Sequence, residues 1–149
     1  MGPLSLPSSG PVYVDSQVLI YAIESNPTYY PLAEPVLAAA EAGEIVLVTS
    51  ELTVLEVLVR PMKTGDNSLV DRYEGVFHQP NVRLVPVSLD VLRAAASLRA
   101  SIPKLRTPDA IHAATALHVS AGLFVTNDFV FRSVPGLSAA ILDDHRSAP

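Results

Sequence analysis

The chain has 149 residues, of which 49% are hydrophobic, and it contains no cysteine. This length suits one compact domain, and the lack of cysteine excludes a disulfide framework and a thiolate metal site. The net charge of −5 has the opposite sign to the usual basic footprint of a nucleic-acid binder. No apolar run reaches the roughly 18 to 20 residues of a membrane span, so we expect a cytoplasmic protein without a targeting leader.

The predicted elements of the first half begin after residues 1–11, a segment rich in proline, glycine and serine that we expect to be flexible. Residues 12–149 are expected to form the single domain. Hydrophobic periodicity and turn signals then predict a strand at 12–14, helices at 16–24 and 31–43, a strand at 45–48, a helix that Ser50 caps and that ends at Arg60, before Pro61, and a polar loop at 62–66.

The second half continues the alternation of short β-branched runs with helical patterns. It predicts a helix at 67–78, a strand at 82–87, a helix that Ser88 caps and that runs to Ile102, a helix from Thr107 to near Gly122, and strands at 123–126 and 139–142. This order is typical of an α/β fold with a mostly parallel central sheet of about five strands flanked by helices.

Four acidic residues occupy positions that need an explanation. Asp15 directly follows a predicted strand and Asp128 closely follows another, so both belong at the carboxyl edge of a parallel sheet, where such folds bind ligands. Asp109 lies in the first turn of a helix, where unpaired backbone N–H groups favour a carboxylate. Glu56 shares a helix face with Leu55 and other apolar residues, and an acid on a core face is costly unless it is paired or bound to metal.

Each acid alone is more simply explained as a helix-start, turn or rim residue. Together they would repel one another, and we therefore expect a hard cation that prefers oxygen ligands. The nucleophile is then expected to be water whose pKa the metal lowers, because the chain has no cysteine and no evident Ser-His-Asp arrangement. His112 is expected to be a hydrogen-bonded helix histidine rather than a ligand or a base.

Four segments of the chain resemble the PIN-domain nucleases, and in particular the short toxins of VapBC type. They are Val14-Asp15-Ser16, residues 50–56 ending in Glu56, residues 107–117 beginning Thr-Pro-Asp109, and Val125-Thr126-Asn127-Asp128 with Phe131. The resemblance covers residues 12–142. One departure is Phe129-Val130, which stand where many relatives carry charged residues.

The resemblance implies a PIN-like three-layer α/β/α fold and a metal-dependent endoribonuclease that is the toxin of a toxin-antitoxin pair. Asp15, Glu56, Asp109 and Asp128 would bind Mg²⁺ or Mn²⁺, supported by Ser16, Thr126 and Asn127. It further implies a homodimer, silenced by a small antitoxin that enters the acidic groove, and cleavage that leaves a 5′-phosphate. The number of metal ions and the RNA that is cut stay open.

Four basic residues lie near the predicted acids in the sequence and are candidate contacts to RNA phosphates: Arg60, Lys63, Lys104 and Arg106. An equally acceptable interpretation is that they are solvated loop charges.

The sequence lacks the motifs of other functions that use acids or glycines at strand ends. A receiver domain needs adjacent acids after the first strand, a dehalogenase-type phosphatase needs Asp-x-Asp although position 17 is Gln, and no glycine pattern fits a nucleotide-binding loop. The alternative that stays open is a PIN-like binding or scaffold module that keeps the fold and lacks catalysis.

Overall fold

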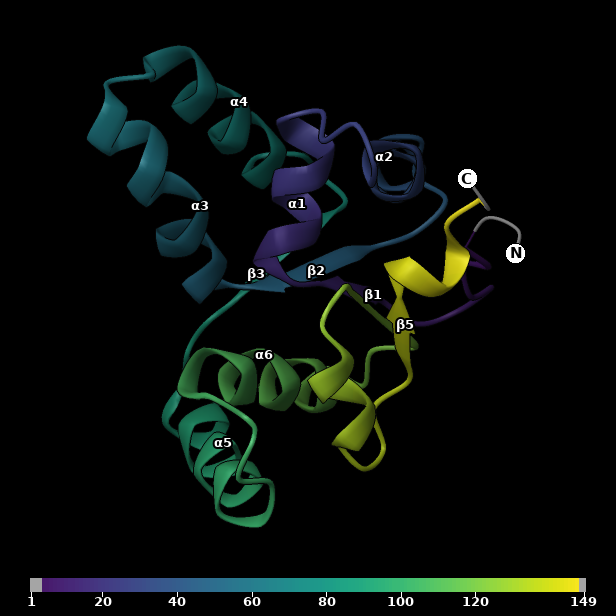
Figure 1. The fold of residues 1–149 in the computed structure, drawn as a ribbon, viewed down its shortest axis with the longest axis vertical. Helices are drawn as coiled ribbons and strands as arrows, with labels where there is room; N and C mark the ends of the chain where they lie inside the picture. Colours follow the sequence, from purple (N-terminus) through teal and green to yellow (C-terminus); the bar gives the residue numbers. More distant parts are fainter. Residues whose placement is uncertain (1–3, 148–149) are drawn as a thin grey trace.

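The computed structural model describes residues 4–147. Within them lies one five-stranded sheet of order β3-β2-β1-β4-β5 in which every neighbouring pair is parallel (Figure 1). The strands are β1 (Val12–Val14), β2 (Leu47–Ser50), β3 (Val82–Val85), β4 (Leu123–Thr126) and β5 (Ala139–Ile141). The helices are α1 (Ser16–Ile23), α2 (Tyr30–Glu41), α3 (Glu51–Thr64), α4 (Asn67–Phe77), α5 (Leu89–Ser101) and α6 (Thr107–His118), with short 3₁₀ helices η1 (Phe129–Ser133) and η2 (Leu142–His145).

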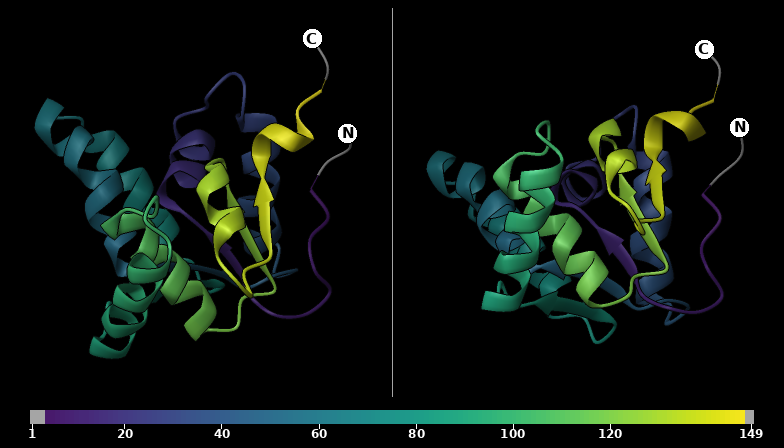
Figure 2. Two further views of the ribbon diagram at one scale, coloured as in Figure 1. Left: turned by 60° about the horizontal axis from the view of Figure 1, so that its bottom comes forward. Right: turned by 90° about the horizontal axis from the view of Figure 1, so that it is seen from below.

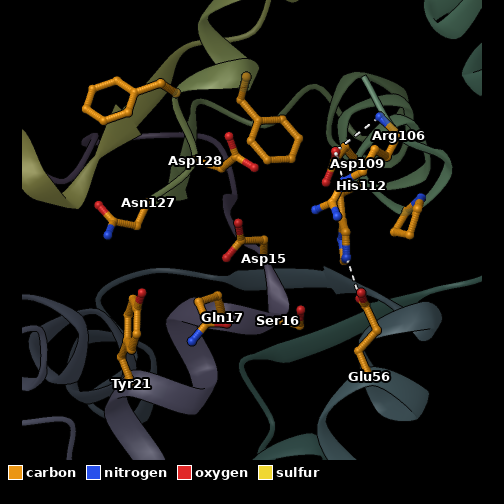
Figure 3. A pocket seen from close by; sticks show the side chains of 13 residues that line it. Asp15, Ser16, Gln17, Tyr21, Glu56, Arg106, Asp109, His112, Asn127 and Asp128 are labelled. Atoms are coloured by element: carbon orange, nitrogen blue, oxygen red, sulfur yellow. Dashed lines mark hydrogen bonds and ion pairs between the residues drawn. The ribbon is translucent and has the colours of Figure 1, made fainter. Parts of the chain in front are cut away.

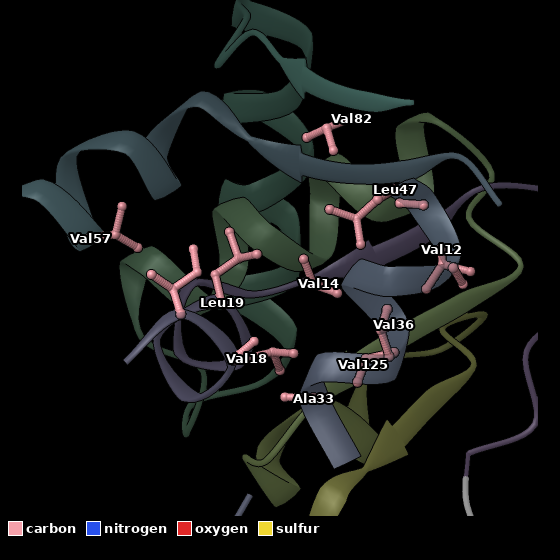
Figure 4. Packing of buried hydrophobic residues seen from close by; sticks show 14 of the residues in the cluster. Val12, Val14, Val18, Leu19, Ala33, Val36, Leu47, Val57, Val82 and Val125 are labelled. Carbon is pink, nitrogen blue, oxygen red and sulfur yellow. The ribbon is translucent and has the colours of Figure 1, made fainter. Parts of the chain in front are cut away.

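The helices cover both faces of the sheet and make the predicted three-layer α/β/α architecture. Helices α1 to α4 lie on one face, and α5 and α6 lie side by side on the other (Figures 1 and 2). Successive side chains of a strand point to opposite faces, so Val12 and Val14 join the core under α1 to α4, while Tyr13 joins the core against α5 and α6. Figure 4 shows the first of these cores, where Val14 and Val125 from the sheet face Val18 of α1.

Helix α3 differs from its prediction in both its end and its buried face. It continues through Pro61 to Thr64, because the stop signal is Gly65, whose φ of +71° allows a left-handed C-terminal cap. The predicted core face is also wrong, since Leu55 and Val59 are 62% and 53% exposed. Thr53, Val57, Leu58 and Pro61 are buried instead. The sequence is apolar on two sides of this helix, so periodicity alone did not identify the buried one.

The predicted flexible segment is only partly within the described residues, because residues 1–3 lie outside them. Residues 4–11 form no helix or strand, yet Leu4 and Leu6 pack against the core beneath α1 to α4. The backbone N–H of Gly122 donates to the carbonyl of Pro11 at 2.8 Å. None of the helices within residues 4–147 has the length and apolar character needed to cross a membrane.

The order in which strands are added to the sheet reverses at β1. From β1 the chain adds β2 and β3 on one side, and then β4 and β5 on the other. In open parallel sheets, ligands bind outside the carboxyl ends of the strands at such a reversal, called the switch point. Asp15 follows β1 and Asp128 follows β4, so both acids lie at this point.

Candidate active site

All four predicted acids line one pocket at the carboxyl edge of the sheet. Asp15, Glu56, Asp109 and Asp128 come from four separate segments, and together with residues such as Ser16 and Asn127 they enclose a cavity of about 560 Å³ (Figure 3). We call this cavity the acidic pocket. The structure therefore brings the four residues of the sequence prediction to one pocket, and their role there stays a prediction.

Asp15 lies at the base of the acidic pocket and is the N-cap of α1. Its Oδ1 accepts the backbone N–H of Val18 at 3.2 Å, and its Oδ2 accepts the hydroxyl of Thr126 from β4. The residue is only 7% exposed, and burial raises the pKa of its carboxyl, while the Thr126 hydrogen bond opposes that rise. The carboxylate is therefore held in place at an electrostatic cost.

The loop after β4 positions Asp128 and Asn127 beside Asp15. The Asp128 N–H donates to the Thr126 hydroxyl at 3.1 Å, and its own carboxylate accepts the N–H of Val130 at 2.9 Å, which caps η1. The Asn127 side-chain oxygen accepts the N–H of Asp143 at 2.9 Å. Thr126 itself is fully buried, so it acts on the pocket only through Asp15 and Asp128.

Asp109 is in the first turn of α6, as predicted, and is paired with Arg106. Its Oδ2 accepts the Arg106 backbone N–H at 3.2 Å and lies 3.4 Å from the Arg106 side-chain Nε. The Asp109 side chain is 12% exposed and that of Arg106 is 77% exposed. Because the Arg106 guanidinium is largely in solvent, its ion pair with the buried Asp109 carboxylate is screened and adds about 1 kcal/mol or less to stability.

Glu56 is held by a histidine that the sequence interpretation treated as structural. His112 Nε2 lies 2.6 Å from Glu56 Oε1 (Figure 3). On the other side of the ring, His112 Nδ1 lies 2.6 Å from the hydroxyl of Tyr13. His112 is 3% exposed and Tyr13 is fully buried. Because an ionised carboxylate has no hydrogen to give, Nε2 carries the hydrogen and donates it to Glu56. The partner that the sequence required for Glu56 is therefore His112.

The acidic pocket has the ligand types of a hard-cation site, although its carboxylates do not cluster around one point. Within residues 4–147, no three aspartate, glutamate or histidine side chains lie close enough to chelate one ion. Carboxylate oxygens are nevertheless the ligands that Mg²⁺ and Mn²⁺ prefer. Arg106 is the only lysine or arginine lining the acidic pocket among the described residues, so four carboxylates face a single fixed positive charge. By the chemistry of their side chains, the residues present fit a divalent cation.

The predicted basic residues separate into two groups. Lys104 and Arg106 line a second pocket of about 460 Å³ that shares Asp109, Asp128 and Phe129 with the acidic pocket. Arg60 lines neither pocket, and its Nη2 lies 3.7 Å from Glu24 Oε1. Lys63 is exposed in the last turn of α3 and also lines neither pocket. The structure therefore brings two of the four candidates to the acids.

Sequence reasoning missed several pocket residues besides His112. Tyr21 lines the acidic pocket, and burial raises the pKa of its hydroxyl. Gln17 and Phe129 line it as well. The only sequence signal for His112 was its place one turn after Asp109 on the same helix, which points both side chains to one side.

Comparison with known proteins places this site in a wider context. The model of the PIN domain family matches residues 12–137. A comparison with curated protein sequences gave no match. Among solved structures, a DNA-bound VapBC from Salmonella typhimurium is similar, with 16% identity and a TM-score of 0.69 over 90% of this chain and 99% of that one.

Two further solved structures share the fold. A toxin-antitoxin complex from Klebsiella pneumoniae has 23% identity and a TM-score of 0.67, covering 88% of this chain and 97% of the other. VapC20 from Mycobacterium tuberculosis, described as a toxin that cleaves the sarcin-ricin loop, has 16% identity and a TM-score of 0.65, covering 82% and 93%. At these identities the structures support the fold alone, whereas the family model spans most of the sequence. The chain belongs to the PIN domain family.

Proposed function

We propose that the chain is a metal-dependent endoribonuclease and the toxin of a toxin-antitoxin pair. The observation that carries the proposal is the meeting of Asp15, Glu56, Asp109 and Asp128 in one pocket at the switch point of a PIN-domain sheet. A purely structural role would not require four acids from four segments to share one cavity. The similarity to VapC20, a toxin that cleaves the sarcin-ricin loop, supports RNA as the substrate class.

The four acids would hold Mg²⁺ or Mn²⁺, with Ser16 and Asn127 at the same pocket wall. A bound divalent ion supplies a water of lowered pKa and stabilises charge on the scissile phosphate. The chain's own residues hold the reacting groups: Thr126 fixes Asp15 through its hydroxyl, and His112 fixes one oxygen of Glu56 and leaves the other free. We expect cleavage to leave a 5′-phosphate and a 3′-hydroxyl, without participation of the RNA 2′-hydroxyl.

Lys104 and Arg106 would contact RNA phosphates beside the acids. Both line the second pocket, and Arg106 already binds one anion, the Asp109 carboxylate. Their positive charges would neutralise phosphates beside the acids, so the net charge of −5 of the chain need not prevent RNA from binding there. Arg60 and Lys63 have no such position and are not included.

The test is to titrate Mn²⁺ while following thermal unfolding and RNA cleavage together. An ion that binds only the folded chain stabilises it by about 2.7 kcal/mol at a concentration of 100 times Kd, so the melting temperature rises. Asp15→Asn is expected to remove both the rise and the cleavage. Asp90→Asn is the matched control, because the Asp90 side chain is 82% exposed on α5 and lies in neither pocket, and it is expected to keep both.

Two results would contradict the proposal. No rise in melting temperature at millimolar Mn²⁺ would favour the alternative of a non-catalytic PIN-like scaffold. Equal cleavage by the unaltered chain and Asp15→Asn would assign the activity to a contaminant. Sequencing the ends of cleaved RNA tests the chemistry, since a 2′,3′-cyclic phosphate would exclude attack by water.

Partners are part of the same proposal. We infer a homodimer in the cytoplasm and a small antitoxin that inserts into the acidic pocket. The apolar face of α3 that is unexpectedly exposed supports a protein partner, because Leu55, Val59 and Met62 are each more than half exposed and lie on the helix that carries Glu56. Replacing Leu55 and Val59 by serine is expected to weaken self-association or antitoxin binding, measured by light scattering and by titration, without changing the melting temperature of the monomer.

A further inference from the structure

The acidic pocket continues into the second pocket, and Phe129 lies where they meet. Both pockets are lined by Arg106, Asp109, Asp128 and Phe129. Lys104 contributes only to the second pocket, while Asp15 and Glu56 contribute only to the first. The combined groove therefore carries four carboxylates and one arginine at the acidic pocket, balanced charges with the added Lys104 at the second pocket, and an aromatic ring where the two meet.

Phe129 is unusual among the aromatic residues of the chain. It is 50% exposed, although Phe124 and Phe131 are almost completely buried. It follows Asp128 directly and begins η1, whose start the Asp128 carboxylate caps. A half-exposed phenyl ring beside a carboxylate gains little from its surroundings, because its apolar surface faces water.

Neighbouring residues hold the Phe129 ring in place. The guanidinium of Arg132 lies 4.8 Å from the ring centroid, and Arg132 is itself paired with Asp144 of η2. Cation–π contact on one side orients an aromatic ring and leaves its other face for a second planar group. The ring is thus a supported platform rather than a mobile side chain.

We propose that Phe129 stacks against an unpaired base of the RNA substrate next to the phosphate that is cut. The inference rests on the proposed ribonuclease function and specifies its substrate class as single-stranded RNA, because a base within a duplex has no free face to stack. Lys104 and Arg106 bind the neighbouring phosphates, and Phe129 supplies the contact that a phosphate cannot. Phe129, the apolar residue that follows Asp128 where many relatives carry a charge, then has a function in binding.

The experiment compares two RNA probes, so that base contacts and phosphate contacts are separated. One probe is a labelled single-stranded octanucleotide, and the other is a ribose-phosphate chain of the same length without bases. Binding is followed by fluorescence anisotropy in EDTA, where we expect no cleavage. Phe129→Ala is expected to weaken binding of the octanucleotide by about 5-fold to 150-fold, the range for one stacked base, and to leave the base-free chain unaffected.

Matched variants assign the effect to the ring. Phe129→Trp keeps an aromatic face and is expected to bind like the unaltered chain, whereas Phe129→Leu keeps apolar volume and is expected to bind like Phe129→Ala. Lys104→Ala is expected to weaken both probes equally, because it acts on phosphates. Tyr30→Ala is the aromatic control, since Tyr30 is 39% exposed and lines neither pocket. Melting temperatures verify that each variant folds.

Three outcomes would overturn the inference. Phe129→Ala with unchanged affinity would show that the ring does not contact RNA and would leave this surface for a protein partner. Equal weakening of both probes, or full binding by Phe129→Leu, would exclude stacking. If the unaltered chain bound neither probe, the assignment of RNA in the proposed function would fail and the inference with it, which is distinct from a failure confined to Phe129.

Discussion

The buried hydrogen bond between Tyr13 and His112 can be tested by replacing each partner with an apolar residue of similar size. The Tyr13 hydroxyl and His112 Nδ1 are 2.6 Å apart, and their residues are 0% and 3% exposed, so water cannot replace either partner. Tyr13→Phe leaves Nδ1 unpaired, and His112→Leu removes the acceptor of the Tyr13 hydroxyl, which keeps only its contacts with Thr49 and the Ser50 backbone. Each change is expected to lower the free energy of unfolding by about 1–3 kcal/mol, the cost of removing one partner from a buried polar group.

The double variant is expected to be more stable than the sum of the two changes predicts. With both polar groups gone, neither member of this hydrogen bond is left without the other, and such paired replacements can be nearly neutral. Glu56 also loses its donor, but its side chain is 25% exposed, so water replaces that bond at little cost. The coupling free energy in a double-mutant cycle is therefore expected to be about 1–3 kcal/mol, measured by urea unfolding without metal.

A second measurement separates stability from the positioning of Glu56. The double variant recovers stability but still lacks the Nε2 donor, so its Mn²⁺ affinity, measured by titration calorimetry, is expected to stay below that of Tyr13→Phe, which keeps His112. Additive losses, with coupling within about 0.5 kcal/mol, would refute the hydrogen bond as described. Equal Mn²⁺ affinity in both variants would refute the role of His112 in holding Glu56.

Three further substitutions test the site and the fold. Burial raises the pKa of Asp15, so the stability that its protonated form gives is lost as the pH rises through that raised value. Asp15→Asn is therefore expected to increase the free energy of unfolding at neutral pH without metal. The gain is expected to disappear below about pH 4, which urea unfolding at several pH values measures. Thr126→Val removes the hydroxyl that contacts both Asp15 and the Asp128 N–H, and is expected to cost about 1–3 kcal/mol in the same assay. Gly65→Ala is expected to lower the free energy of unfolding by about 1 kcal/mol, because φ is +71° and no atom lies within 4 Å of the added Cβ.

The parallel sheet and three of the four acids could be predicted because local rules determine their places. Asp15 caps α1 directly after β1, and Asp128 is the second residue after β4, so their positions follow from strand ends alone. Asp109 follows from the start of α6 after Arg106. Such positions depend only on residues nearby in the chain, so they can be read from the sequence.

Contacts between distant residues could not be predicted in the same way. His112 and Glu56 are 56 residues apart, and His112 and Tyr13 are 99 apart, so only the packing of α6 against the sheet and α3 brings them together. The end of α3 was mispredicted for a different, local reason, because two nearby signals compete there. Pro61 is a usual signal for the end of a helix, but here it is buried and accepts the Asp66 N–H at 2.8 Å, so the cap around Gly65 prevails.

The partners of the four acids explain how the fold retains them without removing their charge. Thr126 and His112 donate hydrogen bonds to Asp15 and Glu56, and the hydrogen bond from the neutral Thr126 hydroxyl orients the Asp15 carboxylate without cancelling its charge. Only Arg106 contributes a fixed positive charge among the described residues of the acidic pocket, and its largely exposed side chain gains little from that contact. Because the acids are oriented but not neutralised, an arriving divalent cation meets uncompensated charge, while Arg106 can turn toward a phosphate of the substrate. Under the proposed function, the same arrangement serves both ligands, because the carboxylates attract the cation and Arg106 attracts the phosphate.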